Sequence, residues 1–132
     1  MQALDTNILV RLFVNDDTAQ ARKARALFDE HADAHEALWI ADTVLVELAW
    51  VLERTYDRPS YEIARALEAL ASNATVKLES GAALISRAAA LYEAGPADFA
   101  DCLLAVKAAA AGCERLRSFD RKMRGLPGVQ LL

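Results

Sequence analysis

Two acidic residues follow short strand-like segments of the chain. Asp5 comes directly after Gln2–Leu4, and Asp120 comes shortly after Arg115–Arg117. In an open α/β sheet, ligands bind at the carboxyl ends of the strands, so both positions suit a binding or catalytic carboxylate. An aspartate in either place is also a good helix cap. Taken alone, each acid therefore has a catalytic and a capping interpretation.

Glu47 lies among apolar residues of a helical pattern, with Val44, Leu48 and Val51 as neighbours. A carboxylate in such surroundings is costly unless a cation or hydrogen bonds satisfy it, so we expect Glu47 to have a partner. The alternative is a glutamate at the edge of a partly buried helix whose carboxylate reaches solvent.

Asp98 and Asp101 lie three residues apart, on one face of a helix that opens after Pro96. The helix dipole offsets the repulsion between two such acids by roughly 0.3–1 kcal/mol each. Asp98 suits that purely structural role better than Asp101, which lies farther into the helix between apolar residues.

A parallel sheet would bring Asp5, Glu47, Asp101 and Asp120 to one edge. So many carboxylates cannot all stay ionised at close range without a cation, and hard oxygen ligands select Mg²⁺ or Mn²⁺ over Zn²⁺. Such a metal lowers the pKa of an attacking water, orients a substrate phosphate and stabilises charge on the leaving oxygen. The predicted chemistry is phosphodiester hydrolysis.

Polar and basic residues extend this predicted site. Asn7 and Ser118 lie close in sequence to Asp5 and Asp120, and their side chains can orient a carboxylate or a metal-bound water. Five basic residues also fall within ten positions near the C-terminus: Arg115, Arg117, Arg121, Lys122 and Arg124. They predict a track for the phosphates of a nucleic-acid backbone, with an ordinary solvated surface as the alternative.

The elements that must position these residues are short strands separated by helices. We expect strands at Gln2–Leu4, Leu38–Ile40, Thr75–Leu78, Arg115–Arg117 and Val129–Leu131. Helical patterns cover Ile8–Val14, Thr18–Ala32, Thr43 to about Asp57, Tyr61–Ala71, Ala82–Ala94 and Ala97–Ala111. Strands joined through helices call for right-handed crossovers. The expected fold is therefore α/β, with a central parallel sheet of four to five short strands sandwiched by helices.

The composition fits one folded domain that spans residues 1–132. The chain has a formal charge of −4, and 55% of its residues are hydrophobic. This mild acidity argues against a general nucleic-acid coat protein. No apolar run reaches the roughly 18 residues that a bilayer span requires, and no signal-peptide pattern is visible, so we expect a cytoplasmic protein without a membrane segment. The two cysteines show no metal-binding spacing.

Four sequence motifs in a fixed order resemble those of PIN-domain ribonucleases, in particular VapC-type toxins of bacterial toxin–antitoxin modules. They are Leu4-Asp5-Thr6-Asn7-Ile8-Leu9, an isolated Glu47, Asp98-Phe99-Ala100-Asp101-Cys102-Leu103 and Ser118-Phe119-Asp120. Ser118 departs from the pattern, because many relatives have threonine there, but the hydroxyl is kept. The resemblance covers essentially the whole chain.

The resemblance implies a PIN fold in which Asp5, Glu47, Asp101 and Asp120 hold Mg²⁺ or Mn²⁺, with Asp98 as an auxiliary member. It implies that the protein is an endoribonuclease toxin whose substrate is RNA, which is cut by a metal-activated water. The implied partners are a cognate antitoxin that blocks the site and a second copy of the chain in a homodimer.

Two other functions compete with this one. A phosphohydrolase or phosphoacceptor receiver domain using Asp5 is disfavoured, because Asp5-Thr6-Asn7 lacks the second acid of a DxD pair. A non-catalytic PIN-like module that binds RNA or protein is disfavoured because every expected carboxylate is retained, and an acidic cluster repels RNA unless metal fills it.

Overall fold

The computed structural model describes residues 1–132, and its elements follow the predicted pattern closely. The strands are β1 (Gln2–Ala3), β2 (Leu38–Ile40), β3 (Val76–Leu78), β4 (Leu116–Ser118) and β5 (Val129–Leu131). The helices are α1 (Thr6–Phe13), α2 (Thr18–Ala34), α3 (Asp42–Arg54), α4 (Ser60–Ser72), α5 (Ala82–Ala94) and α6 (Phe99–Ala110), with a 3₁₀ turn, η1 (Arg121–Met123). The predicted α/β class is confirmed.

The five strands are all paired in parallel, but they form two sheets rather than one. β2 lies between β1 and β3, with Leu38 beside both Gln2 and Val76. β4 pairs only with β5, and Leu116 lies beside Val129. The single sheet that the sequence predicted is therefore divided between β1 and β4. The division could not be predicted, because sequence periodicity identifies strands but does not specify their neighbours.

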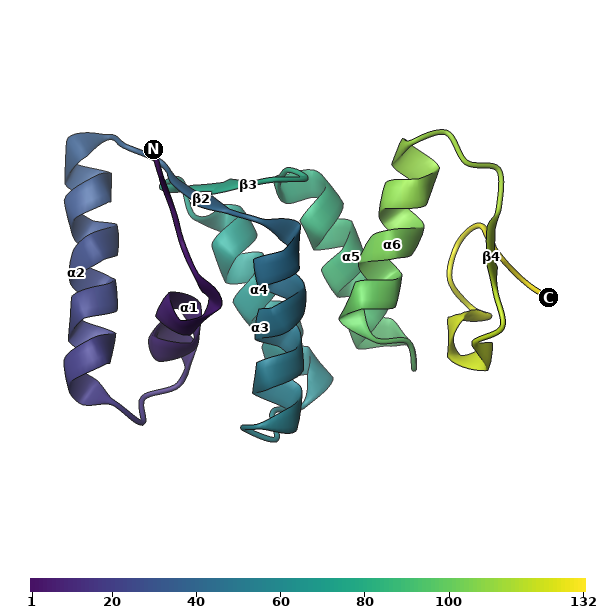
Figure 1. Cartoon of the computed structure of the whole chain (residues 1–132), viewed down its shortest axis with the longest axis horizontal. Coiled ribbons are helices and arrows are strands. Elements are labelled where there is room, and N and C mark those ends of the chain that lie inside the picture. Colours follow the sequence, from purple (N-terminus) through teal and green to yellow (C-terminus); the bar gives the residue numbers. More distant parts are fainter.

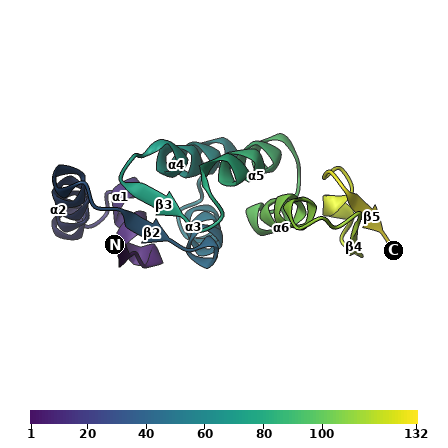
Figure 2. The same ribbon diagram turned by 90° about the horizontal axis from the view of Figure 1, so that it is seen from above.

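The helices lie beside one another along the long axis of the molecule. β2 and β3 lie across the upper ends of the helices in Figure 1. Seen from above, β3 lies between α4 on one side and α1 and α3 on the other, which agrees with the predicted sandwich (Figure 2). α4 packs against α5, and α5 packs against α6, so these three helices lead from the three-stranded sheet to the C-terminal end.

The core forms one continuous cluster of apolar side chains. Leu38 and Ile40 of β2 are fully buried, as are Leu45 and Leu48 of α3. Burying one such side chain contributes about 1.5–3 kcal/mol relative to leaving it exposed. The central strand and the helix that follows it thus each place two fully buried side chains in the core.

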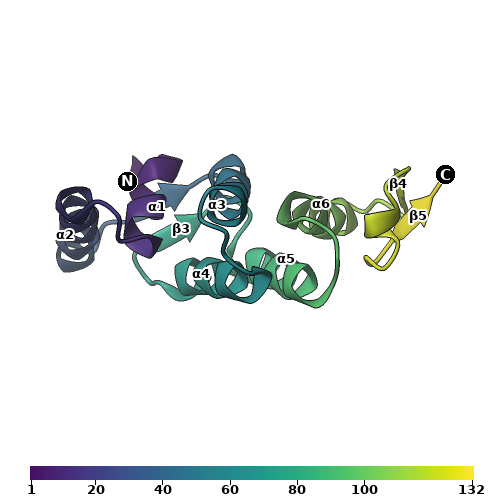
Figure 3. The ribbon, with the colours of Figure 1, turned by 90° about the horizontal axis from the view of Figure 1, so that it is seen from below.

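Residues 111–132, here named the C-terminal unit, contain β4, η1 and β5. Gly112 ends α6 with a φ of 89°, a left-handed conformation that glycine adopts without strain. Two side chains of the unit, Met123 and Leu126, are buried in the common core. Figures 1 and 3 show the unit beyond α6, at the opposite end of the molecule from α2.

Candidate functional site

Asp5 lies two residues after the end of β1 and caps α1. Its Oδ1 accepts a hydrogen bond of 2.7 Å from the backbone N–H of Thr6, and its side chain remains exposed. Asn7, the second residue of the same helix, is also exposed. The capping interpretation of Asp5 is therefore correct, and it leaves Oδ2 accessible to a ligand.

Glu47 is exposed on α3, and no hydrogen bond or ion pair within the chain engages its carboxylate. The expected protein partner is absent, because the apolar neighbours in sequence turn inward while Glu47 faces outward. Leu48, the next residue, is fully buried, because successive residues of a helix point in different directions. Glu47 thus presents a free carboxylate.

Asp98, Asp101 and Asp120 interact through their charges. Asp98 precedes α6, Asp101 lies in its first turn, and Asp120 follows β4. Asp101 is partly buried, and this burial, together with the negative charges of Asp98 and Asp120, raises the pKa of its carboxyl. The structure therefore brings two sequence-predicted site residues and one auxiliary residue close enough for Asp98 and Asp120 to oppose the ionisation of Asp101.

A tight turn fixes Asp120 after β4. Its backbone N–H donates to Ser118 Oγ at 2.9 Å, and its Oδ1 accepts from the backbone N–H of Lys122 at 2.9 Å. Ser118 therefore orients the backbone of the acid rather than its carboxylate, in keeping with a supporting role.

The four predicted metal ligands do not assemble within one chain. No group of three or more acidic, histidine or cysteine side chains lies close enough together to hold a metal ion. Asp5 belongs to the β1–α1 junction, whereas Asp120 belongs to the C-terminal unit beyond α6 (Figures 1 and 3). The residues of a single chain, arranged as they are here, do not fit a complete carboxylate site for a divalent ion.

Asp42 forms a second polar cluster at the carboxyl ends of β2 and β3 that sequence reasoning missed. Its Oδ2 accepts hydrogen bonds from Ser80 Oγ at 2.6 Å and from Lys107 Nζ. Its backbone N–H donates to Glu79 Oε1 at 2.9 Å, while its buried Oδ1 has no partner. The signal that could have found it is an acid two residues after the end of a strand, as for Asp5. The cluster ties α6 to the three-stranded sheet.

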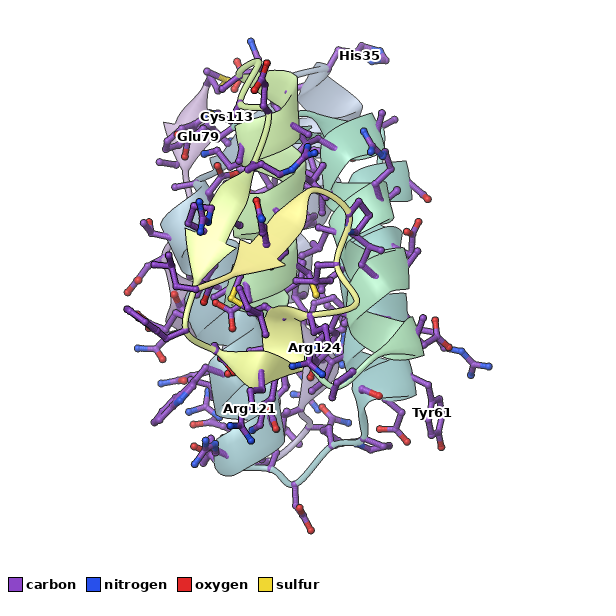
Figure 4. The ribbon with its side chains drawn as sticks, turned by 90° about the vertical axis from the view of Figure 1, so that its right-hand side faces the viewer. His35, Tyr61, Glu79, Cys113, Arg121 and Arg124 are labelled. Carbon is purple, nitrogen blue, oxygen red and sulfur yellow. The ribbon has the colours of Figure 1, made fainter.

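The five predicted phosphate-binding residues all lie on the exposed surface of the C-terminal unit. Figure 4 views this end of the molecule and shows Arg121 and Arg124 together below β4 and β5. The unit carries five basic and two acidic side chains, a formal charge of +3. It is thus a local basic surface on an acidic protein.

The family of the chain is decided by its match to the PIN domain model, which covers residues 3–129. The chain belongs to the PIN domain family. This PIN domain is also similar to a VapC ribonuclease from Aquifex aeolicus (strain VF5), with 28% identity over 126 residues. That similarity covers 96% of this chain and 92% of the relative. None of the helices of the PIN domain combines the length and the hydropathy of a membrane span.

Proposed function

We propose that this PIN domain is an endoribonuclease that hydrolyses RNA phosphodiester bonds with the help of Mg²⁺ or Mn²⁺. The environment of Asp101 carries the proposal, because burial and the negative charges of Asp98 and Asp120 raise the pKa of its carboxyl, and a bound cation would favour its ionised form. The similarity to a VapC ribonuclease along nearly the full length of both chains supports the same activity.

The proposed metal ligands are Asp5, Glu47, Asp101 and Asp120, all of which have carboxylate oxygens of the type that Mg²⁺ and Mn²⁺ prefer. Asn7, Asp98 and Ser118 are the proposed auxiliary residues. When bound, a divalent ion supplies an activated water and stabilises charge on the phosphate. How the ligands come together is taken up in the next subsection.

The proposed biological role is that of the toxin in a cytoplasmic toxin–antitoxin pair. The basic C-terminal unit would hold the phosphates of the RNA substrate, and a cognate antitoxin protein would cover the acidic residues. The exposure of Asp5, Glu47 and Asp120 supports this role, since both a substrate and an inhibitor need access to them.

The test is cleavage of a structured RNA pool by purified, antitoxin-free protein with Mg²⁺ or Mn²⁺, and then with EDTA. Asp101→Asn should lower the rate at least about 100-fold, the usual minimum for losing a group that acts in the transition state. Asp33→Asn, on the exposed face of α2, is the matched control and should cleave at the wild-type rate.

A non-catalytic module that binds RNA or protein is the second candidate. The observation in its favour is that one chain does not assemble three potential metal ligands. Folded wild-type protein that binds RNA and leaves it intact, with either metal and at every protein concentration, would establish this alternative.

A further inference from the structure

The molecule has two open strand edges, one on β1 and one on β4. β1 pairs with β2 on one side only, and β4 pairs with β5 on one side only. Gln2, Ala3 and Arg117 are exposed, and Phe119, next to Asp120, is 81% exposed. An open strand edge offers a row of backbone donors and acceptors to another strand.

The hydrogen bonds of each strand show which backbone groups face the open edges. Leu4 N–H donates to Trp39 C=O at 3.0 Å, so Leu4 faces β2, and the alternation of the strand directs the backbone groups of Ala3 outward. Leu116 N–H donates to Gly128 C=O, and Leu132 N–H donates to Ser118 C=O, each at 2.9 Å. The same alternation directs the backbone groups of Arg117 to the open side of β4.

The C-terminal unit is fixed away from the β1 edge of its own chain. α6 buries Phe99, Cys102 and Leu103, and Lys107 on the same helix forms an ion pair with Asp42 at the start of α3. Met123 of the unit is buried in the common core. To reach β1 of the same chain, the unit would have to break these contacts.

Charge favours contact between the C-terminal unit and the rest of another copy. The unit has a formal charge of +3, whereas residues 1–110 contain ten basic and seventeen acidic side chains, a formal charge of −7. In a dimer with a two-fold axis, the C-terminal unit of each copy can contact residues 1–110 of the other copy. The dimer then has two such contacts between parts of opposite charge.

We propose that β4 of one copy of this chain pairs in parallel with β1 of a second copy. Each of the two resulting sheets has the strand order β3-β2-β1-β4-β5. In a parallel pair, a residue whose backbone groups face the partner strand lies beside a residue whose backbone groups face away from it, so Arg117 pairs with Gln2 rather than with Ala3. Placing Arg117 beside Gln2 brings Asp120 of one chain beside Asp5 of the other chain at the carboxyl end of β1. The inference rests on the proposed function in one respect: the nuclease site is then composed of residues from both chains.

Mass and cross-linking test the dimer without reference to activity. The chain of 14.4 kDa should elute with a mass of about 29 kDa by light scattering at micromolar concentration. In a Cys113→Ser background, Gln2→Cys with Arg117→Cys should form a disulfide between chains. Adjacent strands lie about 4.8 Å apart, within the range for a disulfide.

The matched control combines Gln2→Cys with Gln130→Cys in the same background. Gln130 is an exposed residue of β5, one strand farther out, at about 9.6 Å from β1 in the completed sheet. This pair should remain reduced. A disulfide within one chain for the Gln2 and Arg117 pair, or a mass of 14.4 kDa at every concentration, would overturn the proposal.

Complementation tests the composite site. Asp5→Asn and Asp120→Asn should each be inactive alone, but half of the dimers in an equilibrated mixture contain one intact site. Activity should therefore return to about a quarter of the wild-type value. No recovery from variants that exchange subunits would refute the composite site. A wild-type protein that cuts no RNA would refute the proposed function instead, while mass and cross-linking still decide the strand exchange.

Discussion

The three-stranded sheet and the C-terminal unit both use strands of only two or three residues, but only β2 has a neighbouring strand on each side. β2 has neighbours on both sides, and Leu38 and Ile40 are 0% exposed. β4 has one neighbour, Leu116 is half-buried and Arg117 is exposed. A three-residue strand is too short to bury itself, so its stability depends on what lies beside it.

The acids at the ends of these strands differ in the same way. Asp42, after β2, is 7% exposed and accepts hydrogen bonds from Ser80 and Lys107. Asp120, after β4, is exposed, and its side chain accepts only a local backbone hydrogen bond. The first acid stabilises the fold, whereas the second is available to a ligand. Variants of the two regions should therefore have unequal effects.

The largest effect on stability should come from the central strand. Leu38→Ala should lower the free energy of unfolding by about 2–5 kcal/mol, because it leaves a cavity in a fully buried site. Leu116→Ala in β4 should cost less than about 1.5 kcal/mol, since that side chain is already partly in water. Urea denaturation of both variants measures the difference, and equal losses would contradict the comparison.

Asp42→Ala should have the next largest effect, a loss of about 1–3 kcal/mol in the free energy of unfolding, because it removes the acceptor of two hydrogen bonds in a buried setting. Asp33→Ala, on the exposed face of α2, should change it by less than about 0.5 kcal/mol. Urea denaturation at neutral pH checks both values, and an unchanged midpoint for Asp42→Ala would show that the cluster is not structural.

The loss of stability caused by Asp42→Ala should depend on pH. The hydrogen bond to Asp42 raises the pKa of Lys107 above its ordinary value. The stability from this pair is therefore fully present below the unfolded-state pKa of about 10.4, and it is lost as the pH rises through the higher folded value. The gap in stability between wild type and Asp42→Ala should narrow above that pH in parallel urea titrations, and a constant gap would contradict the assignment.

A smaller effect is expected at the basic surface of the C-terminal unit. Replacing Arg121 and Arg124 by alanine should leave stability unchanged and reduce the salt dependence of RNA binding by about 1.4 in log–log slope, or 0.7 per lost phosphate contact. Fluorescence anisotropy in EDTA measures binding without cleavage. Arg22→Ala with Lys23→Ala on α2 is the matched control, and an equal reduction there would remove the special role of this surface.

The smallest perturbation is chemical labelling of the two cysteines. Cys113 in the C-terminal unit is exposed, whereas Cys102 in α6 is buried and its pKa is raised to about 11, chiefly by burial. A thiol reagent at pH 8 should modify one cysteine in the native protein and two after denaturation. Mass spectrometry of the labelled peptides would identify Cys113 as the reactive residue. Rapid native labelling of Cys102 would show that α6 is not firmly packed.

The bounds of helices and strands could be predicted because they depend mainly on the residues within and next to each element. Leu38–Ile40 and Val129–Leu131 were located to the residue, and Ala82–Ala94 has its predicted bounds. Glu47 was placed on its helix, but the outward orientation of its side chain was not predicted. That orientation depends on how the helix packs, and the apolar residues around Glu47 in the sequence fit more than one orientation. Asp42 was missed because it was read as part of the connection before the helix.

The pairing of strands could not be predicted in the same way. Alternation and length indicate that β1 and β4 are strands, but the choice of neighbour depends on how α5 and α6 pack after β3. The candidate site has the same limitation: the position of each acid in its element follows from sequence, whereas the distance between Asp5 and Asp120 is a property of the assembled sheet.

If two chains complete one site at the open edge of β1, catalysis depends on how much protein a cell contains. When two chains must meet to complete one site, the number of active sites at low abundance rises with the square of the free chain concentration. Occasional transcripts would then yield isolated copies that damage almost no RNA. An antitoxin would not need to capture every copy, because holding the free chain below the dimerisation range would already silence it.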